Sequence, residues 1–163
     1  HYKNFTSMSW VYSCGAGANY GTALESALKM GETIHIPSCC YEIEEYIHGP
    51  NLQLTPQYNV IFFDGNDGAS RRVEQVYKAT RKVSNRAYLI SNNPQLSSDD
   101  HVLSLSDTVS SELCPLVYLP FVQLLSFIVS NDLHSIYQHP LLKEFKAIAA
   151  AKTENFVNYD GDD

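Results

Sequence analysis

The sequence predicts an α/β domain of three layers, in which a doubly wound parallel sheet is flanked by helices. Strand-like and helix-like segments alternate about five times along the 163 residues, which is the pattern of βα units. The strongest strand-like segments are continuous apolar runs, not alternating ones. Such runs are typical of parallel strands that are buried on both faces.

The expected strands each have a local signal. The clearest is YNVIFF, which is closed by the turn sequence DGNDG, and RAYLIS is ended by Asn92-Asn93-Pro94. The run SWVYSC ends at a glycine-rich turn, and two weaker runs complete the set. In chain order, the expected strands are residues 9–14, 35–40, 58–63, 86–91 and 101–105.

The expected helices follow from apolar periodicity and from capping residues. The first has a broad apolar face, the second is polar and basic with a narrow apolar stripe, and the third is long and mostly apolar. Ser110 and Ser111 are N-cap candidates for the third helix. These helices are residues 20–34, 69–83 and 112–133, and a fourth is expected at residues 139–152.

Length and composition indicate one domain, residues 1–135, followed by a C-terminal helix and acidic tail, residues 136–163. The chain is 44% hydrophobic, which is enough for a core, and its net charge is -7. That charge argues against nucleic-acid and anionic-membrane partners. The longest apolar stretch is interrupted by Pro115 and Pro120, so we expect no membrane-spanning helix.

The four cysteines, Cys14, Cys39, Cys40 and Cys114, show no zinc-type spacing. We expect reduced thiols packed as small apolar groups, as in a cytoplasmic protein. The chain begins with His1-Tyr2 and has no initial Met. This start is expected of a piece of a longer protein.

Candidate functional residues gather in residues 23–54. Lys29 and Glu32 lie one turn apart on an otherwise apolar helix, and His48 precedes Gly49-Pro50, which cannot continue a helix. His48 should therefore lie at the end of an element. The alternatives to a functional role are a surface ion pair for Lys29 and Glu32 and a structural role for His48.

Two neighbouring sequence patterns can also be explained without a functional site. Gly15-Ala16-Gly17 either forms a tight turn or holds a phosphate on backbone amides, and Tyr20 occupies the third glycine position of the dinucleotide fingerprint. Glu42 and Glu44 are typical of a solvated face.

The segment GAGxxYxxALExALKxxE, followed by ExxHGP, resembles the second sugar isomerase (SIS) domain of two-domain phosphosugar proteins. The close resemblance covers residues 11–54, and a weaker one in element order continues to residue 133. It implies the SIS-type, flavodoxin-like form of the three-layer fold.

The resemblance also implies roles for individual residues. Glu32 matches the catalytic carboxylate that moves a proton between sugar carbons. His48 matches the histidine that acts as general acid or opens the ring, and which in relatives reaches into a neighbouring subunit's site. Lys29 matches a lysine that assists near the sugar. The expected substrate-binding residues are Gly15, Gly17, Tyr20 and Glu45.

The implied function is an aldose–ketose sugar-phosphate isomerase or a fructosamine-6-phosphate deglycase, with no cofactor and no metal. The implied partners are a sugar phosphate or glycated amino acid phosphate, a second copy in a homodimer or higher oligomer, and an N-terminal SIS domain. The family's phosphate-binding SxSGxT loop and its lysine-bearing tail are missing from this sequence. The alternatives are a phosphosugar-sensing module of a regulator and the isomerase half of an aminotransferase.

Overall fold

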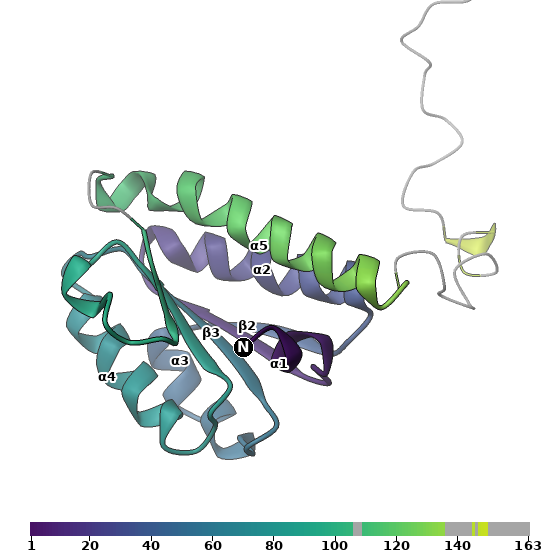
Figure 1. The fold of residues 1–163 in the computed structure, drawn as a ribbon, viewed down its shortest axis with the longest axis horizontal. Helices are drawn as coiled ribbons and strands as arrows, with labels where there is room; N and C mark the ends of the chain where they lie inside the picture. The colour runs from purple at the N-terminus through teal and green to yellow at the C-terminus, as the bar shows by residue number, and fades with distance from the viewer. Residues whose placement is uncertain (106–108, 136–144, 146, 150–163) are drawn as a thin grey trace, which may run out of the picture.

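A five-stranded parallel sheet forms the centre of the computed structural model, with strand order β2-β1-β3-β4-β5 and helices on both faces (Figure 1). This confirms the predicted fold class. The structure describes residues 1–105, 109–135, 145 and 147–149. The strands are β1 (Val11–Gly15), β2 (Ser38–Glu42), β3 (Asn59–Asp64), β4 (Ala87–Ser91) and β5 (Val102–Ser104). The α-helices are α1 (Tyr2–Thr6), α2 (Ala18–Ile34), α3 (Ile43–Ile47), α4 (Ser70–Arg81) and α5 (Cys114–Asp132).

The three central strands β1, β3 and β4 are buried at every position. The edge strands β2 and β5 are only partly buried. Burial on both faces removes the need for polar alternation, which is why the central strands read as continuous apolar runs.

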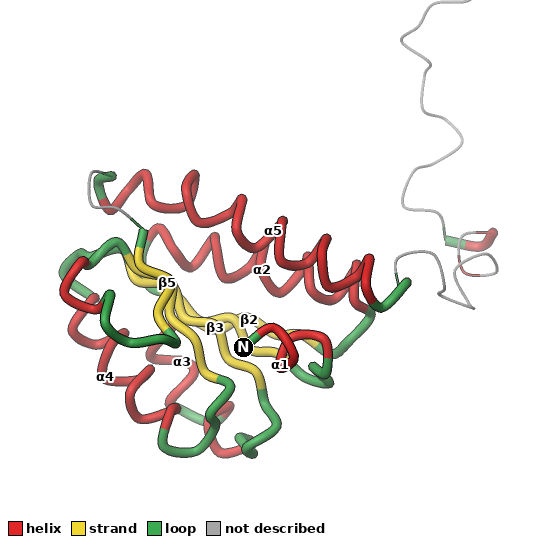
Figure 2. The backbone as a smooth tube through the Cα atoms, in the orientation of Figure 1, coloured by secondary structure: helices red, strands yellow, loops and turns green. Residues whose placement is uncertain are grey.

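Helices cover both faces of the sheet (Figure 2), and a separate hydrophobic core lies on each face. On one face, α2 and α5 pack side by side over alternate strand residues such as Ile61 and Phe63. On the other face, α3 and α4 pack over Val60 and Phe62. Residues that are adjacent in a strand therefore belong to different cores, as the period of two requires.

Helix α5 confirms the helix expected at residues 112–133, but it corrects the expectation that no helix is long and apolar enough to span a membrane. Pro115 lies in the first turn, where a missing N–H costs nothing, and Pro120 lies inside the continuous helix. By length and composition, Ser111–Asp132 could cross a membrane, with a mean hydropathy of 1.9 and 33% of its most apolar window buried. In this structure it packs along α2 (Figure 1).

Several short elements were not predicted. They are α1, α3 and the 3-10 helices Pro50–Gln53, Pro94–Leu96 and Ser111–Leu113. A helix of five residues is too short to show a 3.6-residue periodicity. Ser110 is the N-cap residue of the last 3-10 helix, which leads into α5, but its side chain makes no cap hydrogen bond, and Ser111 lies inside that helix. The expected helix at 139–152 falls mostly outside the described residues.

The cysteine prediction is partly wrong. Cys14 and Cys114 are buried free thiols, and burial raises the pKa of Cys14. Cys40 is half-buried and Cys39 is exposed on the edge strand β2, where one side of the chain faces solvent.

Five large apolar side chains of α2 and α5 are exposed, and we call this set the exposed apolar stripe. Its members keep between 47% and 69% of their surface exposed: Leu24, Leu28, Leu116, Leu124 and Phe127. A contiguous set of large apolar side chains on a protein surface marks a place where another protein surface packs.

Two glycine substitutions test the packing at the start of α2. A Cβ at Gly15 would lie 2.3 Å from the Asn19 carbonyl oxygen, whereas a Cβ at Gly21 meets nothing within 4 Å. We expect Gly15→Ala to lower the free energy of unfolding by about 1–3 kcal/mol through overpacking. Gly21→Ala should raise it by about 0.5–1 kcal/mol, because alanine is the better helix former. Urea denaturation of both variants measures this. Equal effects of the two substitutions would contradict the close approach at Gly15.

Candidate active site

Lys29 lies between two carboxylates on α2. Its Nζ contacts Glu32 Oε1 and lies 3.4 Å from Glu25 Oε1. The hydrogen bond to Glu32 raises the pKa of Lys29. The ammonium form is therefore favoured, and Lys29 can act as a fixed positive charge but poorly as an amine nucleophile.

The carboxylate of Glu32 lies in the last turn of α2. Since α2 connects two parallel strands, it runs opposite to them and ends at the amino edge of the sheet. At 1.5 Å per residue, Glu32 is roughly 20 Å from the glycine turn at the start of the helix. The Glu25–Lys29–Glu32 group borders Leu24 and Leu28 of the exposed apolar stripe.

His48 is the C-cap residue of α3, with φ -94° and its N–H 3.1 Å from the Glu45 carbonyl oxygen. The prediction that His48 ends an element is confirmed. Its side chain is exposed. A cavity of about 290 Å³ lies beside the end of α3, with Ile47, Asn51 and Arg72 in its lining. Asn51 Oδ1 is buried there and has no hydrogen-bond partner among the described residues.

Within one chain, the structure does not bring Glu32 and His48 together. Glu32 belongs to α2, which packs with α5, and His48 follows α3, which packs with α4 on the opposite face (Figure 1). The sheet itself separates the two side chains. A site that uses both residues must take them from two different copies.

The acidic run before His48 is held by local contacts. The Glu44 carboxylate accepts two hydrogen bonds from Arg72, at 2.6 and 3.0 Å, and the bond with Arg72 lowers the pKa of Glu44. Glu42 Oε2 accepts from the Glu44 N–H at 2.6 Å, and Glu45 Oε2 accepts from the Glu42 N–H at 3.2 Å. These bonds satisfy the free amides at the start of α3. Glu45 thus has a structural role besides the one we predicted for it.

The geometry of the glycine segment supports a tight turn. Gly17 has φ 54°, a conformation that favours glycine. The N–H groups of Asn19 and Tyr20 donate to the carbonyls of Ala16 and Gly17, at 3.0 and 3.1 Å. These two amides are therefore already used and do not point to a phosphate.

Tyr20 and Glu45 do come together at the carboxyl end of β2. A negative charge on Cys40 raises the pKa of Tyr20, and those of Glu45 and Glu42 act in the same direction. Tyr20 is half-buried. It therefore remains a neutral hydroxyl at the carboxyl edge of the sheet, away from Glu32.

Two features were missed in the sequence. Glu25 is one turn before Lys29, and the i,i+4 spacing is the signal that reveals such a pair. Asp64 is fully buried at the end of β3, where its carboxylate accepts from the Ser91 hydroxyl at 2.7 Å and from Ser70. An aspartate directly after the most apolar strand is the signal for that site.

The chain is similar in sequence to glutamine–fructose-6-phosphate aminotransferases. A glutamine–fructose-6-phosphate aminotransferase (isomerizing) of Methanothermobacter thermautotrophicus is 30% identical over 129 residues, which is 77% of this chain and 22% of that protein. The corresponding protein of Idiomarina loihiensis is 28% identical over 130 residues, or 78% of this chain and 21% of that protein. The chain thus spans about a fifth of the length of these curated relatives. No family model matches it.

Solved structures share the fold. A tagatose-6-phosphate ketose/aldose isomerase from Escherichia coli matches with a TM-score of 0.72 and 15% identity, over 81% of this chain and 39% of the other. The C-terminal domain of a glucosamine–fructose-6-phosphate aminotransferase from Francisella tularensis matches with a TM-score of 0.65 and 22% identity, over 80% of this chain and 37% of the other. The sequence match, together with the shared fold, shows that the chain belongs to the sugar isomerase (SIS) domain family.

Proposed function

We propose that this chain forms one wall of a phosphosugar isomerase site, with Glu32 as general base and His48 from a second copy as general acid. The observation that carries the proposal is the placement of these two exposed residues on opposite faces of one sheet. Neither side chain packs in a core, so core packing does not explain its position. Both are presented outward, where another copy can reach them.

The proposed step is proton transfer between C1 and C2 of the open sugar. Glu32 takes the proton from the carbon next to the carbonyl group and an enediolate forms, in which Lys29 stabilises the negative oxygen. The proton then returns from Glu32 to the neighbouring carbon. In the same step the hydroxyl proton passes from O2 to O1, so the aldose becomes the ketose with no net oxidation or reduction. In the ring opening that comes first, His48 protonates the ring oxygen while the anomeric hydroxyl releases its proton to water.

The apolar stripe on α2 and α5 supports a shared site. Its leucines border the Glu25–Lys29–Glu32 group, so a protein surface packed on them would also cover Glu32 and exclude water. We propose that this covering surface is another SIS domain, from the N-terminal part of the same protein or from a second copy. That domain would also supply the phosphate-binding loop which this sequence does not have.

Among the related chemistries, we favour aldose–ketose isomerisation. A deglycase must also recognise the amine portion of its substrate, and Glu42, Glu44 and Glu45 are all occupied by local hydrogen bonds. The raised pKa of Lys29 argues against a Schiff base at this residue. The free thiols fit the reducing cytoplasm that we propose as its location.

Replacement of Glu32 by glutamine tests the general base. In the intact protein, we expect Glu32→Gln to lower kcat by about 10²–10⁴-fold, because an amide cannot accept the proton. The affinity for sugar phosphates in a thermal-shift titration should persist. Turnover should be followed with a panel of aldose and ketose phosphates and fructosamine 6-phosphates, whose pattern also identifies the reaction.

Glu74→Gln is the matched control, since Glu74 also forms an ion pair with a lysine of its own helix, Lys78, at 3.1 Å, but on α4. It should leave kcat unchanged. If Glu32→Gln turns over like the wild type, Glu32 is not the base. If the wild type binds a sugar phosphate but converts none of the panel, the chain is a sensing module instead.

Mixed oligomers test whether the two residues come from different copies. Glu32→Gln and His48→Asn should each inactivate a homo-oligomer. A dimer of one chain of each kind has one intact site and one doubly altered site. An equal mixture should therefore recover about a quarter of the wild-type rate, because half of the dimers are mixed.

The rate of the co-expressed and re-purified mixture is the measurement. A tandem-affinity selection of the mixed species should raise the recovery toward one half. No recovery in an assembly that is verified as mixed would overturn the proposal that Glu32 and His48 of different copies share one site.

A further inference from the structure

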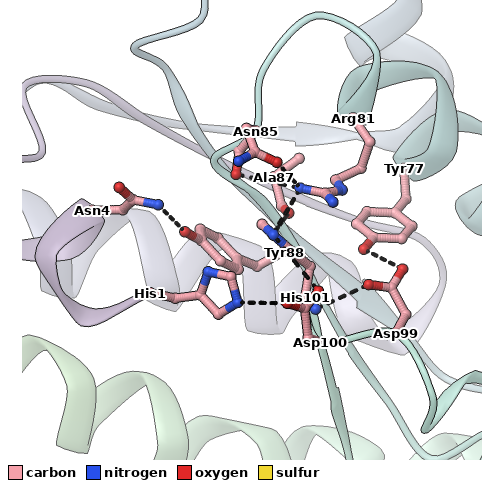
Figure 3. A network of polar contacts seen from close by, with 10 residues as sticks. All are labelled: His1, Asn4, Tyr77, Arg81, Asn85, Ala87, Tyr88, Asp99, Asp100 and His101. Atoms are coloured by element: carbon pink, nitrogen blue, oxygen red, sulfur yellow. Dashed lines mark hydrogen bonds and ion pairs between the residues drawn. The ribbon is translucent and has the colours of Figure 1, made fainter.

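A cluster of imidazole and carboxylate groups that includes neither Glu32 nor His48 lies where α1 meets the β4–β5 edge (Figure 3). One ligand atom each from His1, Asp100 and His101 lies within 4.8 Å of the others. His1 Nε2 is 3.5 Å from Asp100 Oδ2, and His101 Nε2 is 3.8 Å from Asp100 Oδ1. The centroids of the two imidazole rings lie 4.1 Å apart, and the ring planes are inclined to each other by 58°.

His101 is held in place from several sides. Its ring stacks on Tyr88 with centroids 5.1 Å apart, and only 5% of the residue is exposed. Its backbone N–H donates to Asp99 Oδ1 at 2.9 Å, and Asp99 accepts from the Tyr77 hydroxyl at 2.9 Å. The position of Nε2 is therefore fixed before any ion arrives, which lowers the entropic cost of binding.

The second ring nitrogen of His101 has the partner that metal-ligating histidines use. Nδ1 lies 3.2 Å from the Ala87 carbonyl oxygen. When Nδ1–H donates to that carbonyl, Nε2 carries a lone pair directed toward Asp100. A backbone carbonyl on the far nitrogen fixes this tautomer and orients the ring in metal sites.

Arg81 competes for the same ring. Its Nη1 lies 2.8 Å from Nδ1 and 3.0 Å from Nε2 of His101, and 2.7 Å from Asn85 Oδ1 (Figure 3). A neutral imidazole has one nitrogen lone pair. When Arg81 donates a hydrogen bond to this lone pair, it is not free to bind an ion. When Arg81 donates to Asn85 alone, the lone pair of the His101 ring is available to an ion.

We propose that His1, Asp100 and His101 bind a divalent transition-metal ion, with zinc as the expected species. Two imidazoles and one carboxylate form a set of three protein ligands with an open fourth position, which zinc accepts. Asp100 is 80% exposed, so the ion can enter from solvent. The ion would join His1, the residue before α1, to the edge of the sheet.

Zinc titration of the intact protein, freed of any affinity tag, tests the proposal. We expect one ion per chain with a Kd of about 1 μM or tighter, and Co²⁺ in the same site should show tetrahedral visible absorption. His1→Ala and Asp100→Asn change exposed side chains, so both variants should fold. Each should weaken zinc binding at least about tenfold.

Two further variants separate this site from incidental binding. His134→Asn removes a histidine outside the cluster and keeps a residue that tolerates its positive φ of 51°, so zinc affinity should not change. Arg81→Gln should tighten zinc binding, because it removes the competing cation. The proposal is overturned if the wild type does not bind zinc, if binding survives both His1→Ala and Asp100→Asn, or if Arg81→Gln weakens it.

Discussion

The carboxyl edge of the sheet depends on one buried carboxylate, that of Asp64. It accepts hydrogen bonds from Ser70, from Ser91 at 2.7 Å and from the Asn66 N–H at 3.0 Å. The Asp64 carbonyl accepts from the Tyr118 hydroxyl at 2.7 Å. These bonds join β3, β4, α4 and α5. A buried carboxylate without such donors costs several kcal/mol, so the four elements and the charge require one another.

The fold was largely predictable because its strongest signals are local. The runs that became β3 and β4 are apolar at nearly every position, and burial on both faces produces that pattern. The short elements that we did not predict depend on tertiary contacts or on capping side chains. Helix α3 forms because Glu42 and Glu45 cap it, and five residues show no period.

The candidate site was predictable only in part, because some of its contacts join residues that are far apart in the sequence. The spacing of Lys29 and Glu32 along one helix turn revealed a pair, and the structure adds Glu25 to it. The pairing of Glu44 with Arg72 joins residues 28 positions apart, and no local pattern indicates it. The proposed zinc site joins His1 to Asp100 and His101, which again only the tertiary fold brings together.

The separation of Glu32 from His48 follows from topology. Crossovers between parallel strands are right-handed, so two crossovers that move in opposite directions along a sheet place their helices on opposite faces. The order β2-β1-β3 makes the β1-to-β2 and β2-to-β3 connections run in opposite directions. Helix α2 must then lie on one face and α3 on the other, whatever their side chains. The proposed base on α2 and the proposed acid after α3 can therefore meet only in a site shared between copies, and the apolar stripe beside Glu32 lies where we propose that another SIS domain packs.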